Sequence, residues 1–397
     1  MKWETVSLGD VLHSIIGGGT PSKSKSEYWN GDIFWCSVKD MEDDKHYLSY
    51  TKDTITKKGL ENSSANLIKA GTVITSTRMG LGRAFINKVD MAINQDLKAL
   101  IPNERIDNRF LLWTILSKRN ELNMLGRGST VKGITLDILK SIEISLPPLI
   151  VQRRIADILS AYDDLIDNNQ KQIKLLEEAA MRLYKEWFVY LRFPGHENTK
   201  IVDGVPERWR QGQLREYIKV NPRSISKNYP YQEIQYIDIG SVNHGRIEKI
   251  TTYRLSDAPG RAKRLACDGD TIWGMVRPNL KAYALVLSPG ENYVFSTGFA
   301  ILSPKNIPYT FLYCLVTQDS FVGYLINCTN GSAYPAVKPI HFEEAKVIIP
   351  DEGLLVKFHD IVNPMYRRIK VIENQNLYLE EARDRLLPKL MSGEIEV

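Results

Sequence analysis

The chain has 397 residues, which is too long for one ordinary hydrophobic core and suits two domains of common size. Its 43% apolar and 25% charged residues are typical of a soluble globular protein, which argues against disordered and fibrous classes. The 52 Lys plus Arg against 47 Asp plus Glu give a net charge of +5, which permits nucleic-acid binding but is too small to indicate it alone.

The N-terminal segment, MKWETVSLGDVLHS, contains no apolar signal-peptide core. The most apolar runs, such as residues 110–116, are far shorter than a membrane-spanning helix requires. The four cysteines are scattered without a CxxC pair, which argues against a zinc site and agrees with a reducing compartment. We therefore expect a cytoplasmic protein without a membrane segment.

Residues 1–148 contain short β-prone runs broken by Gly, Pro and Asn, with a helical stretch at residues 110–125. This pattern predicts a first mixed α/β domain. The Pro-Pro pair at residues 147–148 then favours a new helix start, and apolar residues follow at spacings of three and four. We predict a helical spacer over residues 149–192, with a phase slip near Asn169 because one step there is longer than a heptad.

Residues 193–208 are a predicted linker, and residues 209–350 repeat the β-prone pattern with a helical stretch near residues 310–326. This region predicts a second mixed α/β domain. Residues 351–397 follow the same three-and-four spacing and predict a second helical spacer. Within it, Pro364 indicates a helix start or a kink.

One segment of the chain occurs twice. LEEAAMRL begins at Leu176, and LEEARDRL begins 203 residues later at Leu379. At the same offset, residues 128–147 align without gaps on residues 331–350. The repeat predicts an α+β protein with two similar mixed α/β domains in pseudo-two-fold positions, separated by two long antiparallel coiled-coil helices.

The two predicted helices differ at two polar positions. Asn169 falls where the second copy has Ile372, and Ile173 falls where the second copy has Asn376. Polar seam residues commonly fix register, so we predict that the two helices pair with each other. The alternative is that each helix packs on its own domain and the asparagines face solvent. The predicted seam residues are Ile155, Ile158, Tyr162, Leu165, Asn169, Ile173, Leu176, Leu183, Phe358, Ile361, Ile372, Asn376, Leu379 and Leu386.

Polar and cationic side chains gather on the loops of both predicted domains. A reader of split DNA sites needs donors and acceptors for base edges and cations for phosphates. The loops TRMGLGR and VRPNLKAY occupy equivalent places in the repeat. Taken singly, each of these side chains is more often an ordinary solvated residue, whereas matched loops favour DNA contact for some of them. The candidates are Lys23, Lys25, Arg78, Arg83, Asn94, Gln95, Arg127, Thr130, Lys132, Arg246, Arg277, Asn279, Lys281, Tyr334 and Lys338.

Catalytic and metal-binding motifs are weak in this sequence. The six histidines lack metal-ligand spacing, and no GK[ST] follows the glycines at residues 17–19, so a turn is the better interpretation of that run. Acid-x-Lys triplets of the nuclease type, such as residues 344–346, are expected by chance in so charged a chain. No N/D-P-P-F/Y methyltransferase motif occurs. We predict no catalytic residue, no bound metal and no bound cofactor.

Three segments, in this order, resemble the specificity subunits of type I restriction-modification systems: GGGTPSKSKSEYWNGDIFWCSVKDM (residues 17–41), GSTVKGITLDILKSIEISLPPLIVQRRIADIL (128–159) and WFVYLRFPGHENTKIVDGVPERW (187–209). The likeness covers nearly the whole chain. It implies two target-recognition domains joined by two long helices, in a non-catalytic subunit that binds double-stranded DNA. It also implies two methyltransferase subunits that dock on the helices, and restriction subunits in the full complex. S-adenosylmethionine, ATP and Mg²⁺ would serve those partner subunits.

Three functions compete for this sequence. A catalytic nuclease or methyltransferase subunit would need a cofactor or metal motif that the sequence lacks. A scaffold that recruits partners explains the helices, but not why two related domains carry different loops. A DNA-sequence reader explains both features, because each domain reads one half of a bipartite target and the helices set the spacing. We favour the reader.

Overall fold

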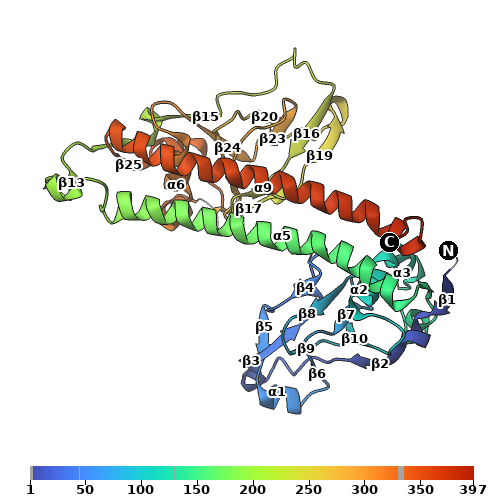
Figure 1. The fold of residues 1–397 in the computed structure, drawn as a ribbon. Coiled ribbons are helices and arrows are strands. Elements are labelled where there is room, and N and C mark those ends of the chain that lie inside the picture. Colours follow the sequence, from blue (N-terminus) through green and yellow to red (C-terminus); the bar gives the residue numbers. More distant parts are fainter. Residues whose placement is uncertain (1–2, 44, 129–130, 330–334) are drawn as a thin grey trace. The chain divides into compact units, whose positions relative to one another are not determined.

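A computed structural model describes residues 3–43, 45–128, 131–329 and 335–397 (Figure 1). The chain forms two compact units. Unit 1 comprises residues 1–170 and 374–397, and unit 2 comprises residues 171–373. Each unit therefore contains part of both long helices, α5 (Leu149–Tyr184) and α9 (Glu352–Ser392).

Unit 1 contains two sheets, ordered β2-β10-β7-β8-β4 and β5-β3-β9-β6, and a strand pair, β1-β11. Its strands are β1 (Glu4–Ser7), β2 (Leu12–Gly17), β3 (Trp29–Cys36), β4 (Tyr47–Leu48), β5 (Asp53–Ile55), β6 (Leu67–Ile68), β7 (Val73–Ser76), β8 (Ala84–Asn87), β9 (Met91–Ile93), β10 (Leu97–Pro102) and β11 (Glu143–Leu146). Its shorter helices are α1 (Lys57–Glu61), α2 (Asn108–Ser117), α3 (Arg119–Leu125) and α4 (Leu136–Lys140).

Unit 2 contains sheets ordered β15-β24-β21-β22 and β19-β16-β23-β20, with the strand pairs β14-β25, β17-β18 and β12-β13. Its strands are β12 (Ile201–Val202), β13 (Val205–Pro206), β14 (Arg210–Gln213), β15 (Ile218–Val220), β16 (Glu233–Ile237), β17 (Val242–Asn243), β18 (Arg246–Ile247), β19 (Thr251–Arg254), β20 (Ala262–Arg264), β21 (Thr271–Gly274), β22 (Tyr283–Leu285), β23 (Tyr293–Ser296), β24 (Phe299–Pro304) and β25 (Lys346–Ile349). Its shorter helices are α6 (Tyr309–Thr317), α7 (Asp319–Asn327) and α8 (Pro339–Glu343).

The two units share one topology. The order β2-β10-β7-β8 in unit 1 matches β15-β24-β21-β22 in unit 2, and β5-β3-β9-β6 matches β19-β16-β23-β20. In the second sheet of each unit the two central strands are parallel: β3 pairs with β9 in unit 1, and β16 pairs with β23 in unit 2. Helix α2 packs on β7 and β8, and α6 packs on β21 and β24. The duplication predicted from the sequence is thus present in the fold.

Strands β7 and β21 form the rigid base of the loops described below. They read VITS and TIWG, and every residue of both strands is buried. A strand covered on both faces does not alternate between apolar and polar residues, so such a short run gives only a weak periodic signal. Because both strands are held by neighbours on each side, the backbone that leaves them starts from a fixed position.

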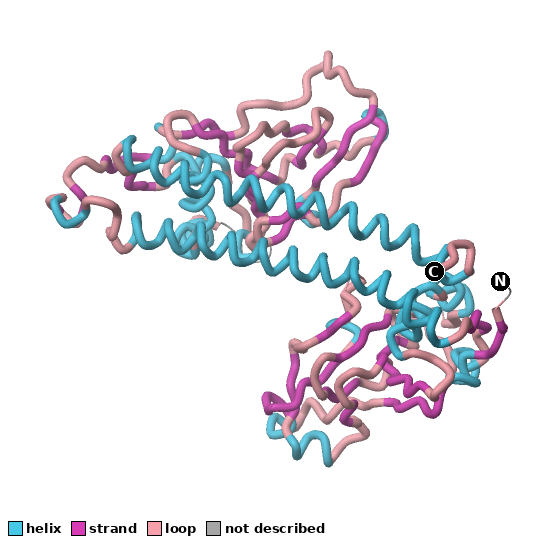
Figure 2. The backbone as a smooth tube through the Cα atoms, viewed as in Figure 1, coloured by secondary structure: helices cyan, strands magenta, loops and turns pink. Residues whose placement is uncertain are grey.

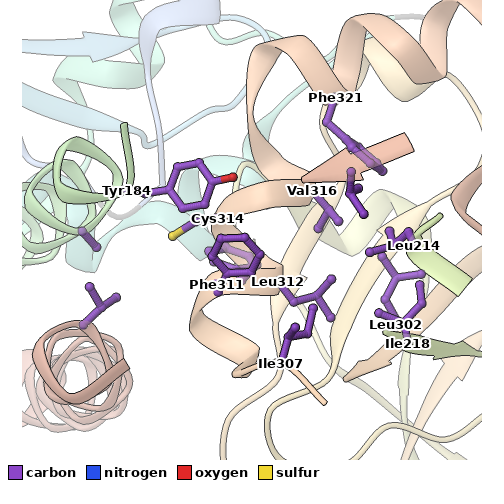
Figure 3. Packing of buried hydrophobic residues seen from close by; sticks show 14 of the residues in the cluster. Tyr184, Leu214, Ile218, Leu302, Ile307, Phe311, Leu312, Cys314, Val316 and Phe321 are labelled. Atoms are coloured by element: carbon purple, nitrogen blue, oxygen red, sulfur yellow. The ribbon is translucent and has the colours of Figure 1, made fainter. Parts of the chain in front are cut away.

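The core of unit 2 is built around the end of α5. Tyr184 of α5 lies beside α6, with its ring centroid 5.6 Å from that of Phe311, and Cys314 lies close by (Figure 3). Burial raises the pKa of the Tyr184 hydroxyl well above its ordinary value. Burial also raises the pKa of the Cys314 thiol, to about 12, so this cysteine is a packing residue rather than a nucleophile.

Helices α5 and α9 lie side by side and antiparallel within each unit (Figure 2). The stripe that α5 buries repeats every seven residues, and the stripe of α9 lies 203 residues further along the chain. In α5 the stripe includes Leu159, Ile166, Ile173 and Ala180, and it continues to Trp187 in the π-helical turn Lys185–Val189. In α9 it includes Val362, Ile369, Asn376, Arg383 and Leu390. The repeat is unbroken, so the predicted phase slip near Asn169 is wrong.

The error arose because both helices carry two apolar residues in succession. Leu165 and Ile361 were predicted to lie in the seam, but they are 52% and 43% exposed, and their neighbours Ile166 and Val362 are buried instead. Adjacent residues lie about 100° apart around a helix, so spacing alone does not choose between them. Moving the seam by one residue at Leu165 removes the apparent extra step.

The other predicted seam residues fall into two groups. Ile155, Ile173, Phe358, Ile372 and Asn376 are buried. The partly buried group is Ile158, Tyr162, Asn169, Leu176, Leu183, Leu379 and Leu386.

Helix α9 is unbroken from Glu352 to Ser392, so the start or kink predicted at Pro364 is not a helix boundary. Pro364 is exposed, whereas Val362 and Tyr366 on either side of it are buried in the core of unit 2. Proline has no backbone N–H, so one helical hydrogen bond is missing there, and the packing of the buried face keeps the helix continuous.

In unit 1 the helix pair has a polar interior. The Asn169 side-chain amide donates a 2.8 Å hydrogen bond to the Asn376 Oδ1. Further along, the Arg383 guanidinium donates to the Asp163 Oδ1 at 2.6 Å, and the His46 Nδ1 lies 2.7 Å from the Asp163 Oδ2. The asparagines therefore pair across the helices rather than facing solvent.

Candidate nucleic-acid interface

Each unit displays one loop that leaves a buried strand and runs beside a second loop. In unit 1, residues 77–83 follow β7 and lie beside residues 131–133, because Arg78 forms an isolated β-bridge with Gly133. In unit 2, residues 275–282 follow β21 and lie beside residues 335–338, because Val276 forms an isolated β-bridge with Ala336. Ala336 lies 203 residues after Gly133, so the same two loops of the repeat meet in both units.

Three backbone hydrogen bonds are repeated in the two loop pairs. The first residue after the strand donates at 2.9 Å in both units, from Thr77 to the Asp96 carbonyl and from Met275 to the Gly298 carbonyl. Its own carbonyl then accepts from the second loop, from Ile134 at 3.0 Å in unit 1 and from Val337 at 2.9 Å in unit 2. Two residues on, Met79 donates to the Lys132 carbonyl at 3.3 Å, and Arg277 donates to the Pro335 carbonyl at 2.8 Å.

The loop in unit 1 is held at its base by apolar packing and by a glycine. Leu81 is buried, although its neighbours Met79 and Gly80 are not. Gly82 has a left-handed backbone with φ of +77°, and a β-carbon there would lie 2.6 Å from the Arg119 Cα. Only glycine fits this close approach without displacing α3.

The predicted glycine turn joins this surface in unit 1. The Thr20 hydroxyl donates a 2.6 Å hydrogen bond to the Gln95 Oε1, and Gln95 is exposed beside Asp96, which accepts the hydrogen bond from Thr77. A β-carbon on Gly18 would overlap the Ile93 carbonyl, which explains why glycine is needed there. Thr20 was not among the predicted residues, and its position opposite Gln95 had no signal in the sequence.

Several predicted contact residues are exposed, and most of them lie on the paired loops. Lys25 lies outside the paired loops, and its ammonium donates to the Tyr28 hydroxyl at 3.0 Å and lies over that ring; this hydrogen bond raises the Lys25 pKa. Thr130 and Tyr334 lie outside the described residues. The candidates that the structure places in the exposed class are Lys23, Lys25, Arg78, Gln95, Arg127, Lys132, Arg277, Asn279 and Lys338.

Two cations predicted to bind DNA are paired with acids of the protein. Arg83 lies 2.6 Å from Asp43 and also donates to the Met41 carbonyl. Lys281 lies 2.7 Å from Asp319. These ion pairs partly neutralise both side chains, so they are weaker candidates than the exposed cations.

Asn94 is a correction to the predicted set. Its side chain is only 6% exposed, and its Oδ1 accepts a hydrogen bond from the Asp96 backbone. It therefore fixes the turn after β9 and cannot present its amide to a base edge. Ser296 has the equivalent role in unit 2, where its hydroxyl accepts from the Gly298 backbone.

Among the described residues, no cluster of three or more His, Cys, Asp or Glu side chains could hold a metal ion. Within the same part of the chain, no helix combines the length and apolar character needed to cross a membrane.

Comparison with known proteins agrees with this geometry. A family profile described as "Type I restriction modification DNA specificity domain" matches residues 1–178. The chain is 28% identical to the Type I restriction enzyme MjaIX specificity subunit of Methanocaldococcus jannaschii, over an alignment covering 100% of this chain and 94% of the relative. Along its whole length, the chain is similar to the specificity subunits of type I restriction-modification systems.

Two other matches extend the comparison. The chain is 35% identical over 176 residues to the EcoR124I/EcoR124II specificity subunit of Escherichia coli, a match that covers 42% of each chain. Its fold is similar to the crystal structure of a Type-I restriction-modification system S subunit from M. genitalium, with a TM-score of 0.62 and 16% identity. That match covers 98% of this chain and 96% of the other, and it supports the fold assignment.

The hairpin β17-β18 docks on acidic residues of unit 2. The Arg246 guanidinium, a predicted DNA contact, lies 4.0 Å from the Glu177 carboxylate of α5. Burial raises the pKa of Glu177, and burial also raises the pKa of Glu373 on α9, although nearby cations oppose both shifts. Arg246 therefore helps to compensate two partly buried acids, which competes with a role in DNA contact.

Replacing Glu373 by Gln should make the stability of the protein less dependent on pH. A carboxyl whose pKa is raised in the folded state binds a proton more tightly there than in the unfolded chain. Wild-type stability should therefore fall as the pH rises from about 4.5 through the raised pKa. Urea unfolding at a series of pH values should show a shallower fall for Glu373→Gln, and no such change for Glu178→Gln, an exposed control on α5.

Proposed function

We propose that this chain is the specificity subunit, and so the DNA-sequence reader, of a type I complex. Each unit reads one half of a bipartite double-stranded target, and the long helices set the gap between the halves. Methyl transfer and cleavage would be carried out by two methyltransferase subunits and by restriction subunits. Those partners would use S-adenosylmethionine, ATP and Mg²⁺, and this chain would supply no catalytic group.

The observation that carries this proposal is the repeated pair of loops. Both units hold the two loops by the same hydrogen bonds, yet the side chains on them differ. A frame that is repeated in both units, with different side chains on it, suits two readers that position themselves alike on the duplex and read different bases. Exposed cations such as Arg78, Lys132 and Lys338 suit phosphate contacts, which hold a protein in register on DNA.

The test is a domain exchange in the complex with its methyltransferase subunits. Residues 209–350 are replaced by the corresponding segment of a relative with another target, and the methylated motif is mapped genome-wide. We expect one half of the motif to change and the other to stay the same. If both halves change together, or neither changes in an active complex, the two units are not independent readers.

A further inference from the structure

Met79 in unit 1 and Arg277 in unit 2 occupy the same place in the repeat and share an unusual backbone conformation. The φ angle is +59° at Met79 and +51° at Arg277. This left-handed region is unfavourable for residues with a β-carbon, and bulky side chains enter it rarely. Arg277 also precedes Pro278, and residues before proline favour an extended backbone. The strain is therefore present in both copies.

A turn requirement alone does not explain these two residues. Glycine adopts a left-handed backbone without penalty, and the next positions of the unit 1 loop, Gly80 and Gly82, use it with positive φ angles. Both copies nevertheless carry a long side chain at the strained position. Strained backbone of this kind clusters at functional sites, where the surrounding structure maintains it.

Both side chains are exposed at the surface of their units. Met79 is 54% exposed, although Leu81 two residues later is buried. Arg277 is also in the exposed class. Each backbone N–H is held by the adjacent loop, through the Lys132 carbonyl in unit 1 and the Pro335 carbonyl in unit 2. The backbone is thus fixed while the side chain extends outward.

The chemistry of the two side chains differs where their backbones agree. An apolar side chain recognises thymine by contact with its methyl group in the major groove. An arginine donates two hydrogen bonds to the O6 and N7 of guanine, which is the commonest specific contact to a base. Exposed cations lie near both side chains. Arg78 precedes Met79 and Lys132 lies on the adjacent loop, and Lys338 lies on the loop adjacent to Arg277. These cations suit contacts with the phosphates that flank the base.

We propose, building on the DNA-reading function above, that Met79 and Arg277 are equivalent base-reading side chains. Met79 reads an A·T pair through the thymine methyl group in the half-site of unit 1. Arg277 reads a G·C pair through guanine in the half-site of unit 2. The shared strained backbone aims the two side chains at the same position relative to their own half-sites.

Glycine substitutions separate reading from folding. Met79→Gly and Arg277→Gly remove the side chain and retain a residue that suits the left-handed backbone, so the thermal unfolding temperature should not fall. In the complex with its methyltransferase subunits, Arg277→Gly should lose roughly 5- to 150-fold of discrimination at one base pair of the unit 2 half-site, because it removes a bidentate contact. Met79→Gly should weaken the preference for an A·T pair at one position of the unit 1 half-site. The other half-site should be unchanged. Met79→Gly should also leave the salt dependence of DNA binding unchanged, because methionine neutralises no phosphate.

Matched variants make the test specific. Met124→Ala removes another exposed methionine of unit 1 and should leave the motif unchanged. Met79→Arg should shift the preference at the affected pair from A·T toward G·C. A folded Met79→Gly complex that methylates the wild-type motif with the same discrimination overturns the assignment of Met79, and the same result for Arg277→Gly overturns that of Arg277. Failure of the domain exchange to move a half-site would instead refute the proposed function itself.

Discussion

Replacing Arg383 by Met is expected to lower the free energy of unfolding by about 3–5 kcal/mol. The Arg383 and Asp163 side chains are only 5% and 8% exposed, and their atoms are 2.6 Å apart in the helix pair of unit 1. Removing the guanidinium leaves the Asp163 carboxylate buried, with His46 as its remaining side-chain partner. A buried charge that loses its partner destabilises the folded state far more than the intact pair stabilises it.

Two further variants identify the cause of this loss. Asp163→Leu combined with Arg383→Met removes both charges and should recover most of the lost stability, to within about 1–2 kcal/mol of wild type. Arg385→Met removes an exposed arginine that pairs with Glu381 on the same helix, and its effect should stay within about 0.5 kcal/mol. Urea unfolding of the full chain measures all three. Equal losses for Arg383→Met and Arg385→Met would show that the buried pair has no special role.

Inserting seven residues after Asn169 and seven after Ile372 should lengthen the spacer between the two half-sites of the DNA target by about three base pairs. Seven residues extend a helix by about 10.5 Å, and one base pair rises about 3.4 Å. Each insertion lies next to a point where the chain passes from one unit to the other. The half-sites themselves should keep their sequences, because neither unit loses a loop. The measurement is the methylated motif of the variant complex, mapped genome-wide.

The unbroken seven-residue repeat determines which insertion is informative. A heptad keeps the buried stripe of each helix on one face, whereas four residues rotate the stripe by about 40° and should destabilise the pairing. Inserting the heptad in α5 alone breaks the match between the helices and is the matched control. A stable, active double-insertion variant with the wild-type gap would show that the helices do not set the spacing.

The repeat in the sequence was sufficient to predict the two related mixed α/β units and the pairing of two long helices. The position of the seam was not, because Leu165 and Ile166 are both apolar and only packing shows which of them is buried. Nor does Pro364 start a new helix, since tertiary contacts of its neighbours keep α9 continuous across it.

The candidate interface was predictable as a set of loops but not as a set of contacts. Arg83 and Lys281 have the composition of DNA-binding residues, yet their acidic partners, Asp43 and Asp319, are distant in sequence. Met79 was overlooked because an apolar residue in a glycine turn carries no polar signal. Its significance depends on a backbone angle and on its equivalence to Arg277, which require three-dimensional coordinates.

The polar interior of the helix pair makes the two copies of the repeat unequal partners. At the places equivalent to Asn169 and Asn376 the repeat has Ile372 and Ile173, which are both buried in the core of unit 2. If two copies of α5 from different molecules paired antiparallel in this register, Asn169 would face Ile173, and the Asp163 carboxylate would face the small apolar Ala180. Two copies of α9 would set Arg383 against Tyr366. Each homotypic pair would bury polar groups without partners, so the seam favours pairing of an α5 with an α9 over pairing of two like helices.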